Sequence, residues 1–191
     1  MLEAEGQHWT VVNVHRVGDE IWHEVEGGPP TVGSALSGRL GWERRHALMR
    51  THGATCSVWR GVWRDYRAQV AGGNMEPFKA RMDFEFENKR RELVEEIEAK
   101  ANDEIQKARS VQVRILPRQE AFAISDLIRT KVNLLPAGIQ HGRVVEILGL
   151  DLQADGGPHV ASTWEVGRLR VVKYKSKGKI NKRLEGVVED L

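Results

Sequence analysis

Four side chains in two short segments have the types and the spacing of a metal site. His52 and Cys56 lie four residues apart in Thr-His-Gly-Ala-Thr-Cys, and Asp155 and His159 lie four residues apart in Asp-Gly-Gly-Pro-His. On a helix, the first spacing places the imidazole and the thiol on one face, within reach of a single ion. Two pairs of soft and borderline donors, held by separate elements, suit a tetrahedral zinc.

The glycines of the second segment and the chemistry of zinc extend this hypothesis. Gly156 and Gly157 permit a sharp turn that brings Asp155 and His159 to one point. A zinc with three or four protein ligands leaves a place for water or for a carbonyl oxygen, so ester hydrolysis is a natural reaction. The alternative is a metal-free domain in which Cys56 is only a small apolar residue of the core.

Helical and strand patterns surround these residues. Apolar or small residues recur at three- and four-residue steps from Trp42 to about Arg67, which predicts the helix that carries His52 and Cys56. Strands are expected over 69–74 and 79–86, as an antiparallel hairpin around a Gly72-Gly73-Asn74 turn.

The next part of the chain predicts a second helix and further strands. Asn88 is a plausible N-cap for a helix over 89–108, whose buried stripe is Leu93, Ile97, Ala101 and Ile105. A short helix is expected at 118–123 after Pro117, followed by an irregular passage at 125–136. Strands are expected over 111–116, 143–148, 169–174 and 183–189. Helices beside a mostly antiparallel sheet predict an α+β domain.

The N-terminal residues predict a different kind of structure. Apolar and polar residues alternate through 9–26 and end at Gly27-Gly28-Pro29-Pro30, which indicates short strands with tight turns, closed by 32–40. We expect residues 1–41 to form part of a small β-barrel, completed by another chain or left incomplete. A homodimer is therefore one expectation, and residues 42–191 form the main domain.

Composition narrows the class of protein. The 191 residues are 40% apolar and 29% charged, with no apolar run of the roughly 20 residues that a membrane span needs. A single cysteine excludes an internal disulfide, and no basic-then-apolar leader is seen, so we expect a soluble protein of the cytoplasm.

The net charge of +2 is small, but basic residues crowd near the C-terminus. We call this set the basic ribbon: Arg168, Arg170, Lys173, Lys175, Lys177, Lys179, Lys182 and Arg183. Such a ribbon suits nucleic-acid phosphates, while the alternative is a solvated hairpin on an ordinary surface.

Two segments carry a family resemblance. Trp-Glu-Arg-Arg-His-Ala-Leu-Met-Arg-Thr-His (42–52) and Leu-Gln-Ala-Asp-Gly-Gly-Pro-His-Val-Ala-Ser-Thr-Trp-Glu-Val-Gly (152–167) resemble the AlaX-type alanyl-tRNA trans-editing proteins, which are similar to the editing domains of alanyl- and threonyl-tRNA synthetases. The resemblance implies a zinc-dependent tRNA-editing domain over 42–191. It further implies that mischarged alanine tRNA is the partner and that serine or glycine is removed from it in trans.

The resemblance also assigns roles to residues. His52 matches the first metal-binding His of the family, Cys56 a position that is normally His, Asp155 a position that is Cys or Asp, and His159 the last His. Asp155 and His159 are the expected catalytic pair. The residues expected to contact the substrate are Ala71, Gly72, Gly73, Asn74, Gly156 and Gly157, and those expected to contact tRNA are Arg170, Lys173, Lys175, Lys177, Lys179, Lys182 and Arg183.

Several positions depart from the family pattern. Besides Cys56, Pro158 stands in place of a Thr, Gly53 in place of a hydroxyl residue, and Ala71 in place of a Thr that contacts the hydroxyl of serine. A polar substrate group that finds no partner is bound less well. The alternative function is therefore a degenerate editing domain that binds tRNA or a protein partner without hydrolysis.

Overall fold

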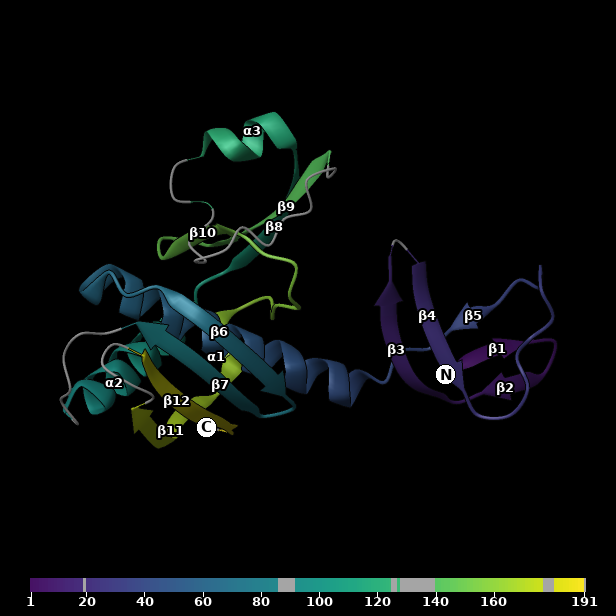
Figure 1. Ribbon diagram of the computed structural model, residues 1–191, viewed down its shortest axis with the longest axis horizontal. Coiled ribbons are helices and arrows are strands. Elements are labelled where there is room, and N and C mark those ends of the chain that lie inside the picture. The colour runs from purple at the N-terminus through teal and green to yellow at the C-terminus, as the bar shows by residue number, and fades with distance from the viewer. Residues whose placement is uncertain (19, 86–91, 125–126, 128–139, 177–180, 191) are drawn as a thin grey trace. The chain divides into compact units, whose positions relative to one another are not determined.

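The computed structural model describes residues 1–18, 20–85, 92–124, 127, 140–176 and 181–190. Its internal contacts divide the chain into two compact units, Met1–Arg45 and His46–Leu191. Figure 1 shows the elements of both units along the chain. None of the described helices is both long and apolar enough to span a membrane.

The C-terminal unit contains most of the regular structure. Its elements in chain order are α1 (Trp42–Tyr66, whose first turn precedes the unit boundary), β6 (Val70–Glu76), β7 (Lys79–Glu85), α2 (Glu92–Gln106), β8 (Val111–Pro117), α3 (Arg118–Ala123), β9 (His141–Ile147), β10 (Asp151–Ala154), a 3-10 turn η1 (Thr163–Val166), β11 (Arg168–Ser176) and β12 (Asn181–Glu189). The strands form two antiparallel sheets with orders β11-β12-β7-β6 and β10-β9-β8. The predicted α+β class is confirmed.

Helix α1 is packed between the two sheets (Figure 1). On one side, Val58 and Val62 join a large apolar cluster with Phe84 of β7, which is completely buried. On the other side, Cys56 packs with Ile147. Because the helix is covered on both sides, its side chains have little freedom to move, and residues on the face toward β10 are held in fixed positions.

Helix α2 protects an edge of the four-stranded sheet. The side-chain amide of Asn102 donates to the carbonyl of Leu169 at 2.8 Å and accepts from its N–H at 2.9 Å. Glu98 accepts from the N–H of Val171 at 2.6 Å. These bonds occupy backbone groups of the edge strand β11 that would otherwise be open to another strand. The predicted buried stripe of α2 is confirmed, and the expected N-cap Asn88 lies outside the described residues.

The hairpin turn was predicted in the wrong place. Strand β6 continues through Gly72, Gly73 and Asn74 to Glu76, and the chain reverses at Pro77-Phe78. Proline has no N–H to give to a ladder, and Phe78 takes a left-handed φ of 61°, so both residues fit a turn better than a strand. The predicted strands at 111–116, 143–148, 169–174 and 183–189 correspond to β8, β9, β11 and β12. Most of the passage at 125–136 lies outside the described residues.

The N-terminal unit consists of two small antiparallel sheets. One has the order β2-β1-β5, formed by β1 (Leu2–Ala4), β2 (Gln7–Trp9) and β5 (Ser37–Gly38), and the other pairs β3 (Val11–Val17) with β4 (Glu20–Val25). Positive φ values at Glu5 and Gly6 make the tight reversal between β1 and β2. The strands described in this unit do not close into a barrel, and the segment 32–40, expected to close the preceding strands, contributes only β5.

Candidate metal and editing site

Helix α1, which carries two of the candidate ligands, also has polar residues in its packed region. Thr51, Thr55 and Ser57 of α1 each donate their hydroxyl to the carbonyl four residues earlier, at 2.8–2.9 Å. These bonds satisfy the hydroxyls within the helix, so they need no partner across the interface. His52 and Cys56 project from the same helix at the predicted i,i+4 spacing toward β10.

Alternate residues from Asp151 to Asp155, in and just after strand β10, contact residues spaced four apart on helix α1. Asp151 lies 3.7 Å from Arg60, the amide nitrogen of Gln153 lies 3.5 Å from the sulfur of Cys56, and a carboxylate oxygen of Asp155 lies 2.9 Å from His52. Two residues along a strand advance by about 6.6 Å, and four residues along a helix advance by about 6 Å. Alternate residues of this strand therefore meet successive turns of the helix.

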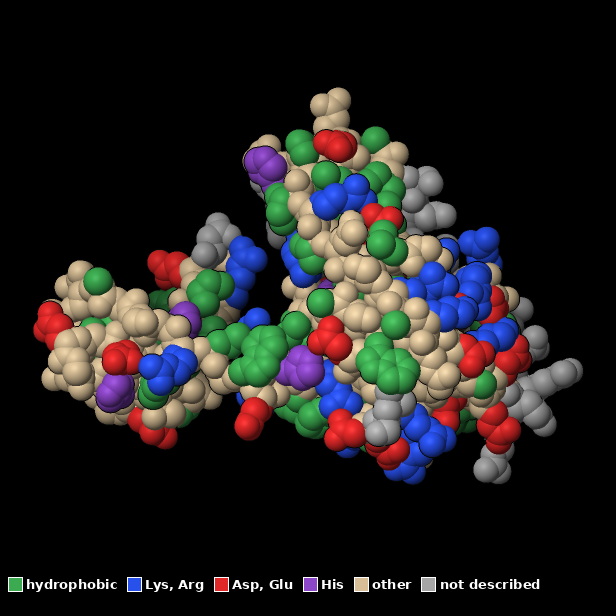
Figure 2. Space-filling view, turned by 180° about the vertical axis from the view of Figure 1, so that it is seen from behind, with side chains coloured by type: hydrophobic (Ala, Val, Ile, Leu, Met, Phe, Trp, Pro, Cys, Tyr) green, Lys and Arg blue, Asp and Glu red, His purple; other side chains and the backbone are tan. Residues whose placement is uncertain are grey.

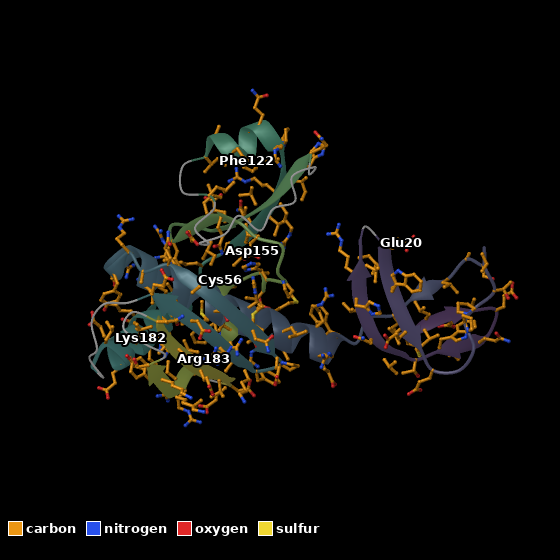
Figure 3. The ribbon with its side chains drawn as sticks, viewed as in Figure 1. Glu20, Cys56, Phe122, Asp155, Lys182 and Arg183 are labelled. Atoms are coloured by element: carbon orange, nitrogen blue, oxygen red, sulfur yellow. The ribbon has the colours of Figure 1, made fainter. Side chains whose placement is uncertain are left out.

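The Oδ2 atom of Asp155 is the centre of the resulting cluster. It lies 2.9 Å from Nε2 of His52, 3.0 Å from Nε2 of His159 and 3.6 Å from Sγ of Cys56. The two imidazole rings meet edge to face, with ring centres 4.6 Å apart. Figure 3 shows Asp155 approaching Cys56 from the segment that follows β10. The four side chains that the sequence singled out are thus brought together.

The loop that carries Asp155 is held on two sides. The N–H of Gly157 donates to Oδ1 of Asp155 at 2.6 Å, which fixes the rotation of the carboxylate. The guanidinium of Arg143 donates to the carbonyls of Asp155 and Gly157 at 2.6 and 2.9 Å, and the N–H of Asp155 returns a bond to the carbonyl of Arg143. Arg143 was not anticipated, because its contact depends on the register between β9 and β10.

Glycine is needed at 157 for a reason that the sequence did not reveal. Neither Gly156 nor Gly157 has a positive φ, so the turn itself does not require glycine. A Cβ atom at Gly157, however, would lie 2.2 Å from Nε2 of His52, whereas one at Gly156 would meet nothing within 4 Å. The loop therefore approaches the imidazole so closely that only a hydrogen fits at 157.

Burial and charge set the protonation of the metal-free cluster. Burial favours the neutral imidazole of His52, but the neighbouring Cys56 sulfur and the Asp155 carboxylate outweigh it and raise the pKa of His52 to about 10. Burial also raises the pKa of the Cys56 thiol, against the opposing charge of His52. For Asp155, burial would raise the pKa, but hydrogen bonds from His159 and His52 lower it well below its usual range.

The donor set fits a metal ion. The four ligand atoms all lie within 4.8 Å of one another, and in a tetrahedral zinc site neighbouring ligand atoms are roughly 3.3–3.6 Å apart. Two imidazoles, a thiol and a carboxylate are all ordinary zinc ligands. The side chains of His52 and Asp155 are 12% and 11% exposed, so the cluster is nearly closed but reaches the surface at these two residues.

The residues expected to bind substrate lie in two places. Gly156 and Gly157 are in the loop of the cluster. Ala71, Gly72, Gly73 and Asn74 lie on the edge strand β6, where the register shifts at Ala71 as in a β-bulge. The same strand reaches the cluster through Met75, whose sulfur lies 3.4 Å from Nδ1 of His52. Met75 is a contact that the sequence did not suggest.

The basic ribbon is less continuous than the sequence suggested. Lys182 is completely buried, because alternation along β12 places it on the same inward face as Leu184, and it is therefore not part of an exposed surface. Arg183 is held by Asp83 in a two-point ion pair at 2.6 Å, and Arg170 is paired with Glu189 at 2.6 Å. Lys177 and Lys179 lie outside the described residues.

Exposed basic residues remain on β11. Lys173 lies 3.7 Å from Glu185, and Lys175 has no acidic partner among the described residues. Figure 2 shows Lys and Arg side chains interleaved with Asp and Glu side chains over one face of the protein. This face therefore carries short basic stretches rather than one broad positive field.

Comparisons with known proteins place this chain in a class of domains. A family model described as the threonyl and alanyl tRNA synthetase second additional domain matches residues 143–185, which include Arg143, Asp155 and His159. An alanine–tRNA ligase of Pyrobaculum aerophilum is 38% identical over 182 residues, which are 92% of this chain but 20% of the ligase. The chain therefore belongs to the class of editing domains found in, or related to, these synthetases.

Free-standing relatives identify the family within the class. An alanyl-tRNA editing protein AlaX-M of Saccharolobus solfataricus is 35% identical over 186 residues, 96% of this chain and 78% of the relative. One of Methanosarcina barkeri is 30% identical over 95% of this chain and 76% of the relative. The chain belongs to the AlaX-M family of alanyl-tRNA editing proteins.

Proposed function

We propose that this protein hydrolyses mischarged alanine tRNA in trans, removing serine or glycine at a zinc site formed by His52, Cys56, Asp155 and His159. The observation that carries the proposal is the convergence of these four ligand atoms to within 4.8 Å of one another, from segments about a hundred residues apart. The family membership supports tRNA as the partner and an acyl ester as the bond that is cleaved.

Each residue of the cluster has a role in the proposal. His52, Cys56 and His159 hold the ion, and Asp155 either completes the ligand set or orients a water molecule. When bound, zinc supplies a polarised carbonyl or a water of lowered pKa. The Gly157 N–H and Arg143 keep the carboxylate of Asp155 in one orientation, so that it accepts hydrogen bonds at a fixed point.

The substrate would reach the cluster at its exposed edge, beside β6. We propose that Ala71 to Asn74 and the Gly156-Gly157 loop contact the aminoacyl end. Among the described strands, β6 is an outer strand of its sheet, so its free edge offers backbone donors and acceptors there, and the small side chains leave room for a ligand. Ala71 offers no hydroxyl to a serine substrate, so discrimination of serine rests on other groups.

Deacylation of serine- and glycine-charged alanine tRNA, with and without a chelator, tests the proposal. We expect wild-type protein to release the amino acid, His159→Ala to lose activity, and chelator to abolish it reversibly. His46→Ala is the matched control, since His46 is on the same helix but pairs with Glu165 instead of the cluster. Binding of charged tRNA without release in any condition would instead identify a degenerate editing domain.

The tRNA surface and the setting complete the proposal. The basic residues Arg170, Lys173 and Lys175 are exposed on β11 and would contact the tRNA backbone, while buried Lys182 is left out. The cytoplasm, where charged tRNA is found, is the proposed location. The homodimer expected from the partial barrel stays a prediction, which light scattering tests by a mass of twice 21.6 kDa.

A further inference from the structure

We propose that Gln153 is a positioning residue of the metal site, which holds the sulfur of Cys56 and the carboxylate of Asp155 in place for the ion. The inference deepens the proposed function and rests on its zinc site. Gln153 belongs to neither ligand pair and to no residue set expected from the sequence.

The contacts of Gln153 point to this role. Its side-chain nitrogen lies 3.2 Å from Oδ2 of Asp155 and 3.5 Å from Sγ of Cys56, so one amide group touches two proposed ligands. A carboxylate only accepts hydrogen bonds, and therefore the nitrogen of the amide must face it. The orientation of the amide is thus fixed by the ligands. The oxygen Oε1 points away from them, buried and with no hydrogen-bond partner among the described residues.

The amide of Gln153 is not explained by the packing of the core. The residue is 3% exposed, and the apolar cluster beside Cys56 contains Ile147 and Leu150. A buried amide with an unsatisfied oxygen is unfavourable for folding, whereas an apolar side chain of similar size would pack there without that cost. The two N–H contacts to the ligands are the compensating gain.

Metal binding by Gln153→Leu and by Gln153→Asn, which keeps an amide but is shorter, tests the role. Substitution of a residue that orients a metal ligand typically lowers metal affinity by about 10–100-fold. We expect the zinc affinity of both variants to fall by this factor in competition with a chromophoric chelator. The matched control is Gln112→Leu, which removes an exposed amide from β8 of the same sheet and is expected to leave zinc affinity unchanged.

Cobalt substitution separates positioning from a general structural effect. An N–H that donates a hydrogen bond to a thiolate lowers the energy of the sulfur lone pairs and therefore raises the energy of the sulfur-to-cobalt charge-transfer band. Loss of that bond should move the band to longer wavelength in both Gln153 variants. Thermal unfolding of metal-free Gln153→Leu should show no loss of stability, because no amide oxygen is left unsatisfied.

The outcomes distinguish this inference from the proposed function. Weaker zinc binding with a shifted cobalt band supports it. Wild-type zinc affinity and an unshifted band in both variants would overturn it while leaving the zinc site intact. Failure of the wild-type protein to bind zinc would overturn both, and weaker zinc binding that accompanies a loss of metal-free stability would assign Gln153 a structural role instead.

Discussion

The close approach of Gly157 to His52 gives a sharp test of the site. In Gly157→Ala, the new Cβ would lie 2.2 Å from both Cε1 and Nε2 of the imidazole. Ordinary contact needs at least about 3.5 Å, so the ring or the loop must move by roughly 1.3 Å. Metal and catalytic groups must be held to within about 0.5 Å of their working geometry, and the substitution exceeds this tolerance.

The expected result is a defect in metal binding rather than in folding. We expect zinc affinity to fall by at least 10–100-fold, equivalent to about 1.4–2.7 kcal/mol, with a corresponding loss of deacylation. The neighbouring Gly156→Ala is the matched control, because its Cβ meets nothing within 4 Å. Neither glycine has a positive φ, so the control should keep wild-type zinc affinity and gain about 0.4–1 kcal/mol of stability.

Chelator competition for zinc and chemical unfolding of both variants measure these effects. Equal zinc affinity in Gly157→Ala and Gly156→Ala would contradict this expectation, because it would mean that the imidazole of His52 need not occupy its observed position to bind metal.

Three further predictions concern protons, tRNA and the core. Burial raises the pKa of the Cys56 thiol, so the thiol keeps its proton at pH 7 without metal, and zinc binding, which needs the thiolate, should release about one proton. Apparent zinc affinity should then rise by about 10-fold per pH unit from pH 6 to 8. Titration calorimetry in buffers of different ionisation enthalpy counts the protons, and binding without proton release would contradict a protonated thiol. Lys173→Ala with Lys175→Ala should weaken binding of any tRNA and reduce its salt slope by about 1–2 in filter binding, whereas an unchanged slope counts against β11 as a phosphate contact. Phe84→Ala should lower the free energy of unfolding by about 3–5 kcal/mol in urea titrations, and a loss below 1 kcal/mol would contradict the packing of α1 on the sheet.

The sequence predicted the features of the fold that depend on local spacing. Helix α1 and its pair His52 and Cys56 follow from a 3.6-residue period that any helix must obey. The pairing of Asp155 with His159 required only a short loop. The α+β class followed from the order of the predicted helices and strands. In β12, Lys182 and Leu184 point inward at alternate positions, as expected for a strand, but the sequence pattern did not indicate that the charged Lys182 would be one of the inward residues.

Features that depend on long-range register were out of reach. The contact of Gln153 with Cys56 arises because β10 and α1 advance by nearly equal steps, and no neighbouring residue signals this match. The hairpin was misplaced because Gly72 and Gly73 are common turn residues, whereas Pro77 is the one that ends the strand. The departure at Gly53 also has a packing reason, since a Cβ there would lie 2.8 Å from Val166.

X-ray absorption at the zinc edge of the loaded protein identifies the atoms that bind the ion. We expect one sulfur at about 2.3 Å and imidazole nitrogens at about 2.0–2.1 Å around a single zinc ion, with the sulfur contribution lost in Cys56→Ser. Zinc bound without a sulfur ligand, or a sulfur contribution that survives in Cys56→Ser, would contradict a site in which Cys56 joins His52 and His159 on one ion.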